Sequence, residues 1–262
     1  MKNQQSIMAC YFRSWRDIAT GDPENKVSMR ELPAEVDIAF VFPDGNEPAT
    51  YWETLESDII PALHQKNIKV VRTVAIDELI ELGATADAIF QRFFSSTNGL
   101  DGLDIDIERT LTETQRNQAE AISRELKQLL GPDRLFIYDT TERGDASLLR
   151  SLEPQLDYVL FQAYGQNPGS VQQHFDRMFN DFLAPSKFLV GFSFYEERGF
   201  RWGDVKVPFE SSTAHAYAAW NPSQGRKGGI FSYAVDRDGV LEGDDTLQAT
   251  DFEWTKQLKG LL

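Results

Sequence analysis

One short acidic segment, residues 100–108, contains the side chains best suited to chemistry in this chain. Asp104, Asp106 and Glu108 alternate there with branched aliphatic residues. Successive side chains of a β-strand point to opposite faces, so we expect the three acids to share one face and the aliphatic residues the other. Carboxyl groups gathered in this way can transfer protons or bind a hard cation.

Burial of these acids would be costly, because a lone carboxylate loses several kcal/mol of hydration free energy inside a protein. A solvent-facing edge strand would avoid that cost. However, a strand between helical segments in a parallel sheet is expected to be apolar on both faces. A magnesium or calcium site is a second alternative. Alternate Cα atoms of a strand lie about 6.6 Å apart, which places the acids in a line rather than a cage and favours proton chemistry.

Eight runs rich in β-branched and aromatic residues predict the strands that position these acids. They cover residues 6–15, 36–42, 69–76, 100–108, 134–141, 156–164, 187–195 and 229–235. Segments of helical periodicity lie between most of them, at residues 51–66 with Pro61 interrupting, 84–94, 112–130, 146–152 and 171–182. This alternation predicts parallel strands covered by helices.

The expected fold class is α/β, with residues 1–262 forming a single (β/α)8 TIM barrel domain, because eight strand-and-helix units fit a chain of 262 residues. A doubly wound open sheet is the alternative. It is disfavoured because no G-x-G-x-x-G turn follows the first predicted strand. In a barrel the active site lies at the carboxyl ends of the strands, so the three acids should point into the barrel, with Glu108 nearest the mouth.

Composition excludes several other functions. The net charge of −15 disfavours nucleic-acid binding, and the apolar runs are too short to span a membrane. Residues 1–6 lack the features of a signal peptide, which predicts a cytoplasmic protein as written, or a secreted or cell-surface one if a signal was trimmed. The single cysteine and the spacing of the three histidines indicate no metal site. We predict no cofactor, and the sequence does not indicate an oligomeric state.

The segment DGLDIDIE at residues 101–108 resembles the D-G-x-D-x-D-x-E signature that glycoside hydrolase family 18 carries on its fourth strand. Within that family the chain is most similar to the compact bacterial endo-β-N-acetylglucosaminidases, which cut the chitobiose core of N-glycans. About 30 residues separate Tyr195 from Gly229, which leaves no room for the insertion found in many chitinases. Tyr164 is followed by glycine and Tyr233 ends the eighth strand, where chitinases commonly have aspartate and tryptophan.

The resemblance implies retaining, substrate-assisted hydrolysis. Retaining glycosidases normally place two carboxyl groups about 5 Å apart on opposite sides of the scissile bond, which acids on one strand cannot do. The implied nucleophile is the substrate's own acetamido oxygen, which forms an oxazolinium intermediate. In this scheme Glu108 is the general acid and base, Asp106 orients the acetamido group, and Asp104 shares a proton with Asp106. Tyr164 would donate a hydrogen bond to the acetamido oxygen.

Four further residues are predicted to bind substrate. Gln162 would hydrogen-bond the sugar, Tyr233 would lie beneath it, and Trp15 and Tyr195, like Trp202, lie at strand ends or in loops where a sugar can stack. The expected substrate is an N-glycan or another oligosaccharide containing GlcNAc. A chitinase is the main alternative, and a non-catalytic sugar-binding barrel is disfavoured by the intact acids. The charged residues 196–198 are expected to be solvated.

Overall fold

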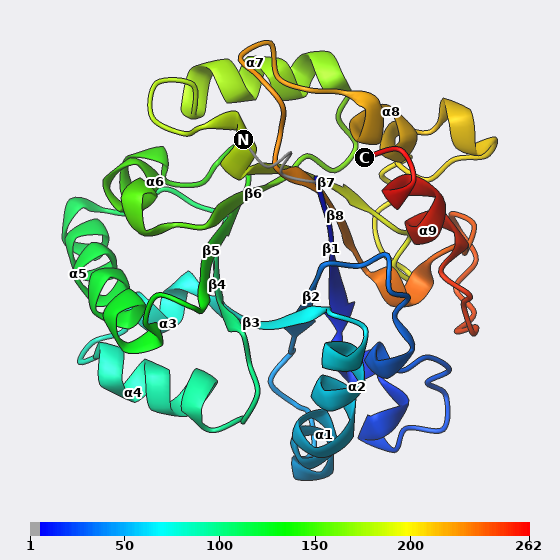
Figure 1. Ribbon diagram of the computed structural model, residues 1–262, viewed down its shortest axis with the longest axis horizontal. Coiled ribbons are helices and arrows are strands. Elements are labelled where there is room, and N and C mark those ends of the chain that lie inside the picture. The colour runs from blue at the N-terminus through cyan, green and yellow to red at the C-terminus, as the bar shows by residue number, and fades with distance from the viewer. Residues whose placement is uncertain (1–5) are drawn as a thin grey trace.

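The computed structural model describes residues 6–262, in which eight parallel strands close into a barrel in the order β1 to β8 (Figure 1). The (β/α)8 fold predicted from the sequence is therefore confirmed. The strands are β1 (Ile7–Arg13), β2 (Ile38–Phe42), β3 (Lys69–Ala75), β4 (Gly102–Ile107), β5 (Leu135–Thr140), β6 (Tyr158–Gln162), β7 (Phe188–Ser193) and β8 (Gly229–Tyr233). Each is shorter than predicted at one end or both. Residues 1–5, where the absence of signal-peptide features was noted, lie outside the described part.

Helices surround the barrel on all sides (Figure 1). They are α1 (Ala49–Thr54), α2 (Ile60–Gln65), α3 (Ile76–Ile80), α4 (Ala86–Phe90), α5 (Glu113–Leu130), α6 (Ala146–Leu152), α7 (Pro168–Met178), α8 (Thr213–Ala219) and α9 (Glu253–Lys259). Helices α3, α8 and α9 were not predicted. The link from β1 to β2 has three 3-10 helices in place of an α-helix, at Ser14–Arg16, Ile18–Thr20 and Met29–Glu31. Further 3-10 helices lie at Glu153–Gln155, Pro185–Lys187, Phe209–Ser211 and Val235–Arg237.

The interruption predicted at Pro61 takes the form of a widened helical turn. Helices α1 and α2 are joined without a break by the π-helical residues Leu55–Ile59, and Pro61 follows at the start of α2. Proline has no N–H to donate to the preceding turn, and a π-helical turn accommodates that missing bond. A second π-helical segment, Gln91–Ser95, extends α4.

The interior of the barrel is filled by side chains of one parity from the strands. They are Ala9, Tyr11, Ile38, Phe40, Val71, Ile137, Leu160, Leu189 and Phe231. Gly191 makes room for this layer, since a Cβ atom there would lie 2.2 Å from the Phe231 ring. The opposite faces of the strands pack against the helices and form a second, larger apolar core. Within residues 6–262, no helix combines the length and the apolar character needed to cross a membrane.

Three aspartates at the base of the barrel make the same contact. Asp37, Asp101 and Asp157 each immediately precede an even-numbered strand, and each accepts a hydrogen bond from the second N–H of the strand before it, at 2.7 to 2.9 Å. Each carboxylate also lies near a basic side chain: Lys259 at 2.6 Å, His64 at 2.8 Å and Lys127 at 3.4 Å, respectively. The first aspartate of the DGLDIDIE segment therefore belongs to the base of the barrel.

Candidate active site

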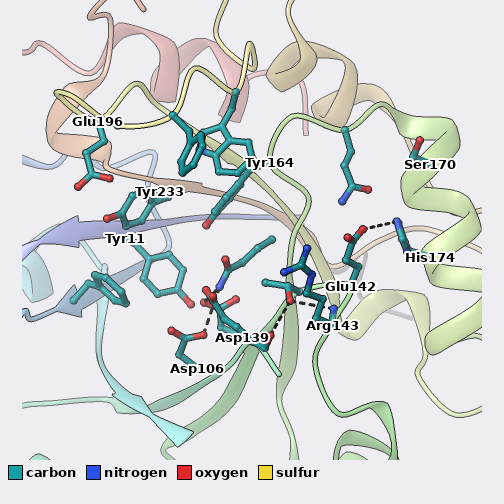
Figure 2. Close-up of a pocket in the computed structure, with 18 residues that line it drawn as sticks. Tyr11, Asp106, Asp139, Glu142, Arg143, Tyr164, Ser170, His174, Glu196 and Tyr233 are labelled. Carbon is teal, nitrogen blue, oxygen red and sulfur yellow. Dashed lines mark hydrogen bonds and ion pairs between the residues drawn. The ribbon is translucent and has the colours of Figure 1, made fainter. Parts of the chain in front are cut away.

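A cavity of about 930 Å³ lies at the carboxyl ends of the strands (Figure 2). This volume is at the upper end of the range for small-molecule sites, which is about 300–1,000 Å³. Aromatic residues form one wall and charged and polar residues the other, and the β4 acids lie between them. The structure thus places the predicted acids at the barrel end where active sites of this fold lie.

The three β4 acids lie at increasing height in the barrel. Asp104 is fully buried, and its Oδ2 accepts hydrogen bonds from the Tyr11 hydroxyl at 2.8 Å and the Thr73 hydroxyl at 2.9 Å. Asp106 is half-buried and lines the cavity. Glu108 follows the last residue of β4 and is exposed at the mouth. The three acids therefore share one face of the strand, as the alternation in the sequence predicts. The deepest, Asp104, is held by two hydrogen bonds, and the outermost, Glu108, is open to solvent.

The two deeper acids favour the protonated form. Burial raises the pKa of Asp104, although the hydrogen bonds from Tyr11 and Thr73 oppose this effect. Burial also raises the pKa of Asp106, and the nearby charges of Glu108 and Asp104 act in the same direction. Interacting carboxyl groups titrate together, so the pair binds a proton more tightly than an isolated aspartate does.

A fourth carboxyl group, Asp139 on β5, was missed by the sequence analysis. It is 2% exposed, lines the cavity and lies opposite Asp106 in the strand register. The signal that identifies it is parity, because Asp139 lies two residues after Ile137, whose side chain is inside the barrel. Tyr11 was missed for a similar reason: it lies on β1, and its hydroxyl reaches Asp104 across the barrel.

Gln162, Tyr164 and Tyr233 line the cavity, where the sequence analysis placed them. The Gln162 amide donates to Asp139 Oδ2 at 3.0 Å and to Asp106 Oδ1 at 3.5 Å, which joins the acids of β4 and β5. The ring centroids of Tyr164 and Tyr233 lie 6.2 Å apart. Burial raises the pKa of Tyr164 well above its usual value, so its phenol keeps the proton needed to donate a hydrogen bond.

Trp15 and Tyr195 do not line the cavity, contrary to their prediction as sugar-binding residues. Tyr195 is 4% exposed, and its hydroxyl donates to Asp245 at 2.8 Å, in the segment that follows β8. Trp15 lies in the 3-10 helix Ser14–Arg16, and its ring packs 6.1 Å from Phe42. Strands β1 and β7 end two residues before Trp15 and Tyr195, so proximity to a strand end did not bring these side chains to the mouth.

Trp202 and Phe200 extend the aromatic wall outward from the strand ends. Trp202 is 42% exposed and Phe200 is 77% exposed, and their ring centroids lie 5.4 Å apart. The Trp202 ring also lies 5.9 Å from Tyr164. The loop that carries them is anchored by buried Asp204, which accepts hydrogen bonds from the N–H groups of Gly165 and Ser193. Exposed aromatic rings held in this way provide a surface on which a sugar ring can stack.

A buried ion network supports the same loop. Arg13 at the end of β1 is fully buried and pairs with Asp236 at 2.6 Å, Glu197 at 2.9 Å and Glu196 at 3.1 Å. Arg16 also contacts Glu197. The prediction that residues 196–198 are merely solvated is therefore wrong for Glu197, whose side chain is 10% exposed. The network joins the segments after β1, β7 and β8.

The opposite wall is polar. Glu142 and Arg143, from the loop after β5, face Ser170 and His174 of α7 across the cavity edge (Figure 2). Glu142 Oε2 lies 3.3 Å from His174 Nε2. Burial lowers the pKa of His174, so this contact is that of a carboxylate with a mostly neutral ring, whereas Glu196 on the other wall pairs with Arg13. Among residues 6–262, no group of three or more histidines, cysteines or acids is arranged to hold a metal ion.

The sequence matches the family model of the endo-beta-N-acetylglucosaminidase EndoS TIM-barrel domain over residues 10–232. Endo-beta-N-acetylglucosaminidase F2 of Elizabethkingia meningoseptica is 35% identical over 276 residues, which cover 98% of this chain and 81% of that protein. Endo-beta-N-acetylglucosaminidase EndoSd of Streptococcus dysgalactiae is 34% identical. That match covers 97% of this chain and 36% of the streptococcal protein.

A solved structure gives a closer match. The crystal structure of an endo-beta-N-acetylglucosaminidase from Cordyceps militaris has a TM-score of 0.92 and 46% sequence identity, over 99% of this chain and 92% of that one. A second crystal structure of the Cordyceps protein holds fucosyl-N-acetylglucosamine-Asn. That protein carries two substitutions, aspartate to asparagine and, two positions later, glutamate to glutamine. Asp106 and Glu108 have the same spacing.

Proposed function

Because this chain belongs to the endo-β-N-acetylglucosaminidase family defined by the EndoS TIM-barrel domain, we propose that it hydrolyses the β-1,4 bond between the two GlcNAc residues of the N-glycan core. The chain is a glycosidase of this family, as the resemblance of residues 101–108 indicated. The ligand of the Cordyceps relative supports the choice of bond, since it contains the GlcNAc that stays on asparagine after such a cut. The barrel is the proposed catalytic domain.

One observation carries the proposed mechanism: the acids that are free to react all lie on one side of the cavity. Asp106 and Glu108 come from β4, and Asp139 comes from the adjacent strand. Of the carboxyl groups elsewhere on the wall, Glu196 is paired with Arg13, and Glu142 lies 3.3 Å from the His174 ring. A carboxylate nucleophile would have to approach C1 from the side opposite the general acid. The substrate's acetamido oxygen can attack C1 from that side, so no nucleophile from the protein is required.

In this mechanism Glu108 donates its proton to the glycosidic oxygen as the bond from that oxygen to C1 breaks. The acetamido oxygen forms a bond to C1 at the same time, which gives a cyclic oxazolinium ion. The Glu108 carboxylate then takes a proton from water as the water oxygen attacks C1 and reopens the ring. Two inversions at C1 retain the configuration of the sugar.

The remaining cavity residues orient the acetamido group. Asp106 accepts a hydrogen bond from its N–H and stabilises the positive charge that develops on the ring. Asp104, held by two hydroxyl groups, supports Asp106 from below. Tyr164 donates to the acetamido oxygen, and Tyr233 lies beneath the sugar. Gln162, whose amide donates to the neighbouring acids, keeps its carbonyl oxygen for a substrate N–H or O–H.

The first experiment is a mass measurement on a glycoprotein that carries a single N-glycan. The wild-type protein should leave one GlcNAc on the asparagine, and it should cut linear chitin oligosaccharides poorly. Glu108→Gln should lower the rate by about 100- to 10,000-fold with the fold retained by circular dichroism. Glu142→Gln, which removes a carboxylate from the opposite wall, is the matched control and should stay within about threefold of wild type.

Two results would overturn the mechanism. Full activity of Glu108→Gln would exclude this residue as the general acid. Equal rates on a substrate whose acetamido group is replaced by a free amine would exclude attack by the acetamido oxygen. Proton NMR of the fresh product should show the β-anomer first, as retention requires.

A further inference from the structure

Asp139 is a buried carboxyl group that the mechanism above does not use. Its side chain points into the barrel from β5, and its register partner on β4 is Asp106. The two carboxyl groups lie side by side at the bottom of the cavity (Figure 2). A barrel interior normally carries apolar side chains at such positions. An aspartate there costs hydration free energy, so its presence calls for a physical reason.

Only one of the two carboxyl oxygens of Asp139 has a hydrogen-bond donor among the described residues. Its Oδ2 accepts from the Gln162 amide at 3.0 Å, and the same amide reaches Asp106 Oδ1 at 3.5 Å. Its other oxygen, Oδ1, is buried and has no hydrogen-bond partner among the described residues. A buried carboxylate oxygen without a donor is unfavourable. A protonated oxygen at this position would instead be a donor, beside a carboxylate that can accept.

The charges around Asp139 favour that protonated form. Burial raises the pKa of Asp139 well above its usual value. The charges of three acids on β4 or directly after it raise this pKa further, while the Gln162 hydrogen bond has the opposite, weaker effect. The groups that face it are Asp106, Asp104 and Glu108 from β4, Tyr11 from β1, and Gln162 and Tyr164 from β6 and the turn after it.

We propose that Asp139 is a positioning residue of the reaction: as a neutral acid it donates a hydrogen bond to Asp106 and, together with Gln162, holds that carboxylate toward the acetamido N–H. One Asp106 oxygen is then fixed by the two donors and the other is free for the substrate. Charge-assisted hydrogen bonds of this kind are strong and orient a carboxylate well. This inference deepens the proposed function and rests on it.

Two substitutions separate a neutral donor from the alternatives. Asparagine at position 139 keeps an oxygen that accepts from Gln162 and an N–H that can donate to Asp106. Leucine has the same number of side-chain heavy atoms, branched at the same position, but offers neither group. If Asp139 acts as an anion, both variants should lose activity. If Asp139 only fills space in the barrel, both variants should remain active.

The test measures kcat and KM on a fluorescent asparagine-linked N-glycan. Asp139→Asn should keep kcat within about threefold of wild type. Asp139→Leu should lower kcat by about 30-fold, as expected for the loss of a hydrogen bond to a charged group, with KM within about threefold. An inactive Asp139→Asn overturns the assignment of a neutral donor, and a fully active Asp139→Leu overturns the positioning role. If Asp139→Leu does not fold, Asp139→Ala replaces it with the same expected loss.

A spectroscopic measurement tests the protonation state without using activity. In protein labelled with ¹³C at aspartate carboxyl carbons, the signal lost in Asp139→Asn belongs to Asp139. At neutral pH it should have the chemical shift of a neutral acid, and the shift of a carboxylate would overturn the proposal. Asp238→Asn is the matched control. Asp238 is also buried, but it accepts hydrogen bonds from Trp254 and Thr255 at the start of α9, away from the cavity. Its substitution should leave kcat unchanged.

Failure of the proposed function would look different. In that case the wild-type protein would leave the glycan intact, or Glu108→Gln would cut it at the wild-type rate. The carboxyl signal of Asp139 would still report its proton. Conversely, a wild type that cuts and a Glu108→Gln variant that does not, combined with an ionised Asp139, would reject this inference alone.

Discussion

Replacing Asp106 by asparagine is expected to stabilise the folded protein at alkaline pH while it impairs hydrolysis. Burial and the neighbouring acids raise the pKa of Asp106, so the folded state binds a proton more tightly there than the unfolded chain does. This costs no stability below the ordinary aspartate pKa of about 3.9. The cost grows as the pH rises above that value and is complete above the raised pKa. Asparagine has nearly the same shape, can still accept from Gln162, and never ionises.

The size of the effect follows from the sharing of protons in the barrel. One pKa unit corresponds to about 1.4 kcal/mol, but burial raises the pKa of Asp104 and Asp139 as well, so removing one of the three interacting carboxyl groups relieves only part of the repulsion. We expect the free energy of unfolding to rise by about 1–3 kcal/mol near pH 9 and to change little near pH 4. For a chain of this size, the Tm near pH 9 should rise by roughly 2–6 °C.

The assay is thermal unfolding, followed by circular dichroism and calorimetry at both pH values. Asp145→Asn is the control of opposite sign. Asp145 is also buried, but its hydrogen bonds with Arg116 and two backbone N–H groups outweigh the effect of burial and lower its pKa. Its charge therefore stabilises the fold, and its loss should lower the Tm at both pH values. A folded Asp106→Asn whose Tm near pH 9 is at or below that of wild type would refute the reasoning.

Three further predictions test the cavity walls. Trp202→Ala should raise KM for a labelled N-glycan by about 3- to 10-fold with kcat within about twofold, because an aromatic stacking surface is lost; an unchanged KM would remove Trp202 from the substrate site. Tyr164→Phe should lower kcat by about 10- to 100-fold, since one hydrogen bond to the developing intermediate disappears. Steady-state kinetics measures this, and an unchanged kcat would contradict the role of Tyr164 as a donor. Arg13→Met should lower the free energy of unfolding by about 3–5 kcal/mol, because Asp236 is left buried without its cation; urea titration measures this, and a loss below 1 kcal/mol would contradict it.

Local patterns were sufficient to predict the fold and the β4 acids. The alternation in residues 100–108 decides which side chains enter the barrel, and it needs no information from other strands. The same applies to the eight strands, each of which is a short run rich in β-branched and aromatic residues. The short helices α3, α8 and α9 have five to seven residues, too few to show a clear period, and they form because their apolar sides pack on the barrel.

The residues that sequence analysis misplaced depend on contacts between distant segments. Tyr195 is turned away from the cavity by Asp245, 50 positions later in the chain. Glu197 is buried by Arg13, which comes from the other end of the sequence. The parity of β5 is enough to place Asp139 inside the barrel, but its position beside Asp106 depends on the register between β4 and β5, which one strand alone does not reveal. Parity along a strand is local information, whereas neighbours across the barrel are not.

The aspartates at the base have a consequence for the far end of the barrel. A slip of one residue between neighbouring strands would turn every side chain of one strand to its other face. Asp101 ties β4 to the second N–H of β3, and this alignment sets Thr73 level with Asp104. Asp37 links β1 to β2 and Asp157 links β5 to β6 in the same way, so the register of each pair is fixed by its own hydrogen bond. Asp101 lies at the opposite end of the barrel from the cavity. Its hydrogen bond from the Val70 N–H nevertheless fixes how far along the barrel axis Asp104 and Asp106 are placed.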